Sequence, residues 1–232
     1  MTIIYVKNGI GMNTFVGEIH KYIDIKSIDN LCIFDIGSRD GNDARYLHNC
    51  FALNAKHAKH ANTYAFEAHP QEYEIHKDIN RDINWINLAI YEYDGQIVFF
   101  PKTINSGIHS IRDRGSEFGQ GEIIIPCKKV STILHEFQIN VPQIVKIDVE
   151  GCSLEVLRSF EDRINDVMIF HIESEEEEYF KDQYLQSQVF AYLEAHGFFM
   201  TMYSTTDGSN QHDSVWVNPS AIRRECLQLK SF

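Results

Sequence analysis

The order of hydrophobic and polar residues along the chain predicts an α/β protein. From about residue 31 onward, short apolar runs alternate with segments in which apolar residues recur at helical spacing. This alternation is typical of β-α-β units, which form a doubly wound, mostly parallel sheet with helices on both faces. The runs that predict strands are 31–36, 63–67, 85–89, 96–100, 123–130, 143–148, 167–173, 198–203 and 214–217.

The segments with helical spacing have recognisable ends. Pro70 is suited to the first turn of a helix, Ser131 to the N-cap of another, and Gly197 to the residue after a helix. Asp94 and Gly95 predict a hairpin turn. The expected helices are 12–23, 43–53, 70–79, 131–137, a helix from 153 onward, and 184–196.

Length and composition predict a single domain in a chain of 232 residues. We expect a helical extension over 1–30, the α/β core over 31–217 and a tail over 218–232. No apolar run approaches the roughly 20 residues of a membrane span, and no secretory signal is evident, so we expect a soluble, cytoplasmic protein. The five scattered cysteines predict reduced thiols.

The charge balance argues against nucleic acid and anionic membranes as partners. The formal net charge is -12, which opposes attraction to phosphate groups. Nucleic acid and membranes are therefore not expected partners. The sequence leaves the oligomeric state open.

Two features near the start of the core predict an adenosine ligand. Asp35, Gly37 and Gly41 follow or end the first core strand, where glycines let a backbone approach a ligand closely. Glu67 ends the next strand and is suited to accept both hydroxyls of a ribose. The alternatives are a glycine turn without a ligand and a solvated glutamate. The third glycine of the dinucleotide fingerprint is missing, which disfavours a pyrophosphate ligand.

A second group of charged residues lies at the carboxyl ends of two later strands. Lys146, Asp148 and Glu150 share one side of a buried strand pattern, and Glu173 ends the following strand. Buried charges are unfavourable unless they are paired or belong to a site. We expect Asp148 and Glu173 to flank a crevice, as a base or as oxygen ligands of a hard divalent cation. A structural ion pair is the alternative.

Other polar residues have simpler interpretations. His171 is interpreted as a hydrogen-bonded core histidine, and 175–178 as a solvated acidic face rather than a metal site. His57 and His60 are expected to be exposed.

The chain resembles the FkbM-type family of S-adenosylmethionine-dependent methyltransferases. The resemblance rests on 34–42, 64–67, 87–95 and 146–157 in that order. It implies a Rossmann-like class I methyltransferase fold, with a seven-stranded sheet whose last strand is antiparallel. It also implies methyl transfer, usually to a hydroxyl oxygen of a small-molecule or glycan acceptor, whose identity the sequence leaves open. It also implies that Gly37 and Gly41 border the methionine moiety, Glu67 the ribose and Ala89 the adenine. Arg39 departs from the family pattern, and is expected either to form a local salt bridge or to reach the cofactor carboxylate.

Asp148 is the expected base, or the anchor of a Mg²⁺ ion that lowers the pKa of the acceptor hydroxyl. Glu150 and Glu173 are assigned supporting catalytic roles. Positioning and exclusion of water are expected to supply much of the rate.

A long polar segment, 103–121, is expected to be a surface loop. Its part 105–110 is expected to cover the crevice and select the acceptor, with His109 either a rival base or an exposed loop histidine. Two other function classes remain open at this point: a nucleotide-dependent oxidoreductase, and an adenosine-binding module without activity.

Overall fold

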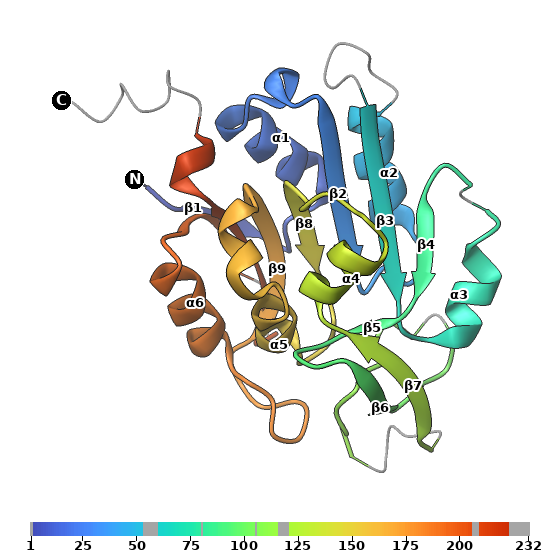
Figure 1. Cartoon of the computed structure of the whole chain (residues 1–232). Helices are drawn as coiled ribbons and strands as arrows, with labels where there is room; N and C mark the ends of the chain where they lie inside the picture. The colour runs from blue at the N-terminus through green and yellow to red at the C-terminus, as the bar shows by residue number, and fades with distance from the viewer. Residues whose placement is uncertain are drawn as a thin grey trace.

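A computed structural model describes residues 2–52, 60–79, 81–104, 106–115, 121–205 and 209–222. Within them, a central sheet has the strand order β1-β10-β11-β9-β8-β2-β3-β4 (Figure 1). The strands are β1 (Ile4–Lys7), β2 (Asn30–Ile36), β3 (His60–Glu67), β4 (Asn84–Asn87), β8 (Ile144–Ile147), β9 (Ile169–Glu175), β10 (Phe199–Thr205) and β11 (Gln211–Val217). Only β11 runs antiparallel to its neighbours. The expected seven-stranded sheet is therefore present, and β1 extends it beside β10.

Helices cover both faces of this sheet (Figure 1). They are α1 (Met12–Tyr22), α2 (Asn42–Phe51), α3 (Pro70–His76), α4 (Val130–Glu136), α5 (Ser153–Arg158) and α6 (Gln186–Ala195). The sheet separates two hydrophobic cores, and alternate residues of β2 face one or the other. Phe34 and Ile36 pack in the core beneath α4, α5 and α6, whereas Leu31 and Ile33 pack in the core beneath α1 and α2. The doubly wound arrangement therefore follows from apolar residues on both sides of each central strand.

A second, three-stranded sheet lies beside the carboxyl ends of the central strands (Figure 1). Its order is β5 (Ala89–Ile90), β7 (Ile123–Lys128) and β6 (Gly95–Phe99). The apolar run 85–89, expected to be one strand, is divided between the two sheets. Its first part, in β4, pairs with β3, and Ala89 pairs with Cys127 of β7. Apolar pattern alone does not reveal this change of partner, because both parts are extended.

Several element boundaries differ from expectation. The helix expected to reach residue 79 ends at His76, and α4 begins at Val130 after Lys129 rather than after an N-cap at Ser131. The backbone N–H of Ser131 instead donates to the carbonyl of Ser159. The expected helical extension, 1–30, contains strand β1 as well as α1.

Short 3-10 turns at Ile25–Ser27, Glu161–Asp166 and Pro219–Ala221 complete the described chain. Most of the expected tail, 223–232, lies outside the described residues, as do His57 and the side chain of His60. No helix of the described residues has the length and apolar character needed to cross a membrane. Cys32, Cys50, Cys127 and Cys152 are free thiols, and Cys226 lies outside the described part.

Candidate active site

A cavity lies where β2, β3 and β8 end, next to the small sheet. Its walls combine a glycine-containing loop, an apolar patch and several carboxylates. The lining includes Gly37, Ser38, Arg39, Asp40, Asp43, Glu67, Leu88, Ala89, Ile90, Phe99, Gly107, His109, Ser110, Lys146, Asp148, Glu150 and Cys152. Several of the residues expected to bind a ligand therefore face one cavity, in agreement with the position of ligand sites in open α/β sheets.

Gly37 shapes the floor of this cavity because the backbone turns there with φ +83°. A Cβ atom at this position would lie 1.8 Å from the carbonyl oxygen of Asp148. The backbone N–H groups of Gly37 and Ser38 both donate to the carbonyl of Phe66, at 3.0 Å each. Glycine at this position therefore lets the ends of β2 and β8 meet without a side chain between them.

Asp35 supports the loop from behind and is not among the described residues that line the cavity. Its Oδ2 accepts hydrogen bonds from the Ser38 hydroxyl at 2.7 Å and from the Ala44 N–H at 3.1 Å. Gly41, with φ +70°, precedes α2 and is also outside the lining. Asp35 holds the loop by these hydrogen bonds and Gly41 provides the turn before α2, while contact of either residue with a ligand stays a prediction.

Glu67 places a buried carboxylate in the cavity wall. Its Oε2 accepts the N–H of Arg39 at 2.6 Å, and its Oε1 accepts the N–H of His69 at 2.7 Å. Burial raises the pKa of Glu67 to about 7, although these two hydrogen bonds favour the ionised form. The Arg39 guanidinium is half exposed and lies 3.6 Å from the carboxylate of Asp40. The local salt bridge expected for Arg39 is thus present.

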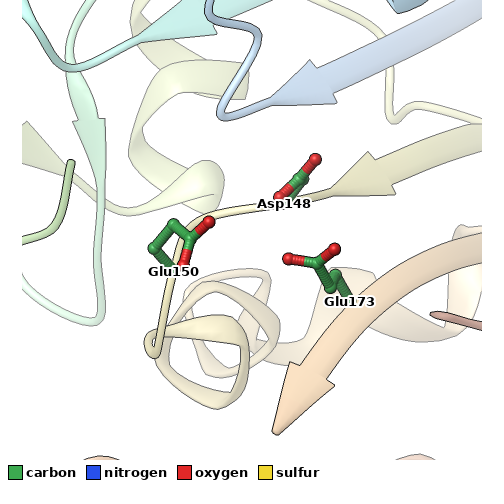
Figure 2. Close-up of side chains that lie close together, drawn as sticks. All are labelled: Asp148, Glu150 and Glu173. Carbon is green, nitrogen blue, oxygen red and sulfur yellow. The ribbon is translucent and has the colours of Figure 1, made fainter. Parts of the chain in front are cut away.

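Three carboxylates gather at one end of the cavity. Figure 2 shows Asp148 directly after β8, Glu150 on the loop that follows, and Glu173 on β9. One oxygen from each lies within 4.8 Å of the others. The side-chain N–H₂ of Gln211 donates to Glu173 at 2.5 Å and to Glu150 at 3.3 Å. Glu173 is not among the residues that line the cavity, so it stands behind the other two.

Lys146 makes the electrostatics of this cluster asymmetric. Its ammonium lies 2.9 Å from Asp148, 3.1 Å from Asp43 and 3.8 Å from Asp35. Burial opposes ionisation of Asp148, but the attraction and hydrogen bond of Lys146 outweigh it and lower the pKa of Asp148.

Glu150 and Glu173 differ from Asp148 in that their pKa values are raised. Burial and the charges of Asp148 and Glu175 raise the pKa of Glu150 to about 8. Burial and the surrounding carboxylates raise the pKa of Glu173 well above its usual value. At neutral pH, Asp148 is therefore ionised and most Glu150 side chains hold a proton, while the raised pKa of Glu173 disfavours its ionised form, since like charges this close disfavour full ionisation.

Comparison with known proteins identifies the family of this chain. The model of the methyltransferase FkbM domain matches residues 35–200. The chain belongs to the FkbM methyltransferase family. It is accordingly an S-adenosylmethionine-dependent methyltransferase with the class I fold, as the strand order also indicates. No curated protein matches the sequence.

Solved structures similar to this FkbM-family methyltransferase include three other methyltransferases. The precorrin-6y C5,15-methyltransferase of Geobacter metallireducens GS-15 has 11% identity and a TM-score of 0.45, with 88% of this chain and 87% of that chain covered. The magnesium protoporphyrin IX methyltransferase of Synechocystis PCC 6803, with bound SAM, has 10% identity and a TM-score of 0.46, with 89% and 75% covered. A SAM-dependent methyltransferase of Aquifex aeolicus has 12% identity and a TM-score of 0.45, with 90% and 89% covered.

Two expectations about exposure in this FkbM-family methyltransferase are wrong. Glu175, expected on a solvated acidic face, is buried and accepts the N–H of Gly151 at 3.2 Å, whereas 176–178 are exposed as expected. His109, for which an exposed loop position was an alternative, has a side chain only 7% exposed. The position of His171 agrees with a core histidine, because it is buried and its Nε2 lies 3.2 Å from Asp213.

Sequence reasoning missed two residues of the FkbM-family site. Gln211 reaches the carboxylate cluster from β11, and Asp43 reaches Lys146 from the first turn of α2. The acidic first turn of a helix after a glycine loop was a usable signal for Asp43. Gln211 lies 38 residues from Glu173, and nothing local marked it.

Proposed function

We propose that this methyltransferase transfers the methyl group of S-adenosylmethionine to a hydroxyl oxygen on a small molecule or glycan. The observation that carries the proposal is the shape of one cavity. Glu67 and an apolar wall lie at its edges, and Asp148 and Glu150 face the same space. A nucleoside site and an acid-base site thus adjoin each other, as methyl transfer requires.

The cavity residues fit the parts of S-adenosylmethionine. Glu67 uses one acceptor position on each oxygen for a backbone amide, so its carboxylate keeps capacity for two ribose hydroxyls. Ala89, Leu88 and Phe99 offer an apolar wall for adenine. Gly37 leaves backbone exposed beside the methionine end, and the half-exposed Arg39 is within the same wall as a partner for the cofactor carboxylate. We assign Asp35 and Gly41 to shaping this loop.

The cofactor supplies a methyl group on a positively charged sulfur. A new O–C bond forms as the S–C bond breaks, the bonding pair stays with sulfur, and the hydroxyl proton must be removed. We assign the acceptance of that proton to Asp148, which is ionised beside Lys146. Glu150 shares the cavity wall and hydrogen-bonds acceptor groups, while Glu173 supports Asp148 from behind.

The alternative role for Asp148 is as a Mg²⁺ ligand together with Glu173. Carboxylate oxygens are the ligands that hard divalent cations prefer, and the three here converge. Binding of a cation would require the ionised form of Glu173, which its raised pKa disfavours, and would compete with Lys146 for Asp148. Activity that disappears with a chelator and returns with Mg²⁺ would favour the ligand role. Activity unaffected by a chelator would favour the base.

Calorimetry with S-adenosylmethionine, S-adenosylhomocysteine, NAD and NADP tests the proposal. We expect micromolar dissociation constants for the first two and no binding of the others. Tighter binding of NAD or NADP would favour the oxidoreductase alternative and would contradict the proposal. Methyl transfer from radiolabelled S-adenosylmethionine to a panel of sugars and hydroxylated small molecules then separates an active enzyme from an adenosine-binding module.

A further inference from the structure

The stretch from Phe100 to Ser110, described except for residue 105, contributes Gly107, His109 and Ser110 to one wall of the cavity. Its two ends are tied together, because the N–H of Phe100 donates to the carbonyl of Ser110 at 2.8 Å. The Ser110 hydroxyl also donates to the carbonyl of Glu150 at 2.7 Å. Between these ends, Gly107 and His109 line the cavity.

The imidazole of His109 has a different polar neighbour at each nitrogen. Its Nδ1 accepts the backbone N–H of Lys102 at 2.9 Å. Its Nε2 lies 3.5 Å from Oε1 of Glu72, a fully buried carboxylate on α3. A backbone amide only donates, so Nδ1 carries no proton and the proton of the neutral ring is on Nε2, facing the carboxylate. Neither nitrogen is available to accept a proton from a substrate, which argues against His109 as the base.

His69 connects this arrangement to Glu67. Its Nδ1 caps α3 by accepting the N–H groups of Gln71 and Glu72 at 3.2 and 3.4 Å. The backbone N–H of His69 donates to Glu67, and the centroid of its ring lies 4.4 Å from that of the His109 ring. The carboxylate assigned to ribose, the start of α3 and the loop wall are thus in direct contact with one another.

We propose that His109 is a positioning residue for the cofactor, which fastens the backbone at Lys102 and its own segment, 106–110, to Glu72 of α3 and so slows the release of the nucleoside. The role rests on the proposed function, since it assumes S-adenosylmethionine in this cavity. One ring nitrogen of His109 accepts a hydrogen bond from the backbone of Lys102, and the other presents an N–H to the carboxylate of Glu72. Its side chain lines the cavity, so a cofactor bound there would cover it.

The ring must remain neutral for these contacts to exist together. Burial and the nearby ring of His69 lower the pKa of His109 to about 4, and Arg39 acts in the same direction while Glu72 opposes it. Nitrogen chemical shifts of histidine-labelled protein test this directly. We expect His109 with the proton on Nε2, unchanged between pH 8 and pH 5. A proton on Nδ1, or titration near pH 6.5 as in an exposed histidine, would overturn the proposal.

Two variants divide the contacts of the ring. His109→Asn retains an acceptor for the Lys102 amide and loses the donor to Glu72, whereas His109→Gln retains the donor and loses the acceptor. Stopped-flow measurement of S-adenosylhomocysteine release supplies the readout. We expect His109→Ala to release it about tenfold faster, with the association rate little changed and the other two variants between, because His109→Ala loses both polar contacts of the ring and each of the others loses one.

His135→Asn is the matched control, because His135 is an exposed histidine on α4 outside the cavity lining. It should release S-adenosylhomocysteine at the wild-type rate. A folded His109→Ala protein that does the same would overturn the positioning role while the proposed function stands. Wild-type protein that binds no S-adenosylhomocysteine would overturn both. If His109→Ala does not fold, the nitrogen shifts of the wild type and the release rates of the Asn and Gln variants still test the positioning role.

Discussion

Glu67 offers the sharpest test of how the cavity holds a nucleoside. Glu67→Ala removes both acceptors assigned to the ribose hydroxyls, and a hydrogen bond to a charged group contributes about 1.5 to 3 kcal/mol. Since about 1.4 kcal/mol corresponds to a tenfold change in affinity, the dissociation constant of S-adenosylhomocysteine should rise at least tenfold. Titration calorimetry measures this directly.

The pKa of Glu67, about 7, adds a second signature to the same measurement. The ionised carboxylate is the better acceptor, so affinity should fall as pH decreases below 7, by up to about tenfold per pH unit if only the ionised form binds. Glu67→Gln cannot ionise and should lose this part of the pH dependence. Calorimetry at pH 6, 7 and 8 separates the two proteins.

The controls for this prediction concern folding and general charge effects. Both substitutions disturb hydrogen bonds from the N–H groups of Arg39 and His69, so each variant must first show cooperative thermal unfolding. Glu74→Gln removes a nearby carboxylate whose side chain is 63% exposed, and it should bind as the wild type does. An unchanged dissociation constant in folded Glu67→Ala would exclude this residue from the site. A flat wild-type pH profile would refute the role of its ionisation.

Three further predictions concern other parts of the site. Asp148→Asn should lower turnover by about 10² to 10⁴ while S-adenosylhomocysteine still binds, and near-normal turnover would show that another carboxylate acts. Gly37→Ala should reduce the free energy of unfolding by at least about 1 to 3 kcal/mol, since a Cβ would meet the Asp148 carbonyl; a wild-type denaturant midpoint would contradict this close approach. Burial raises the pKa of Glu175 to about 7, so the folded state binds its proton more tightly than the unfolded state. Its contribution to stability should be present below about pH 4.5 and lost as pH rises through 7, and Glu175→Gln, which stays neutral, should show a smaller decline in denaturant stability from pH 5 to pH 8.

The sheet and its two helical layers were predictable because their signals are local. Phe34 and Ile36 alternate with Leu31 and Ile33 within a single strand, and both sets are apolar, which indicates burial on both faces. Gly37 was also identifiable, since a glycine after a buried strand is typical of a sharp turn into a helix. The family match over residues 35–200 agrees with the motifs found in the sequence.

The candidate site was predictable only in part. Strand ends correctly indicated that Asp148, Glu150 and Glu173 would meet, because parallel strands bring their carboxyl ends to one edge. The same reasoning did not show that Asp35 accepts hydrogen bonds from Ser38 in the loop and from Ala44 in α2. Alternation along the strand sets the side that Asp35 faces, but only the packed structure shows that the first turn of α2 meets it there.

By itself, the sequence determined most of the segments that become strands and helices, because hydrophobic period and turn residues act over a few neighbouring positions, whereas strand β1 was not expected. Only the tertiary structure decided that Glu175 is buried, that His109 faces Glu72, and that Gln211 lies between Glu150 and Glu173. His109 and Glu72 are 37 positions apart in the chain, and Gln211 and Glu150 are 61 positions apart. Burial and hydrogen bonding depend on which surfaces the packed sheet, helices and loops bring together, and such long-range pairing leaves no periodic trace in the chain.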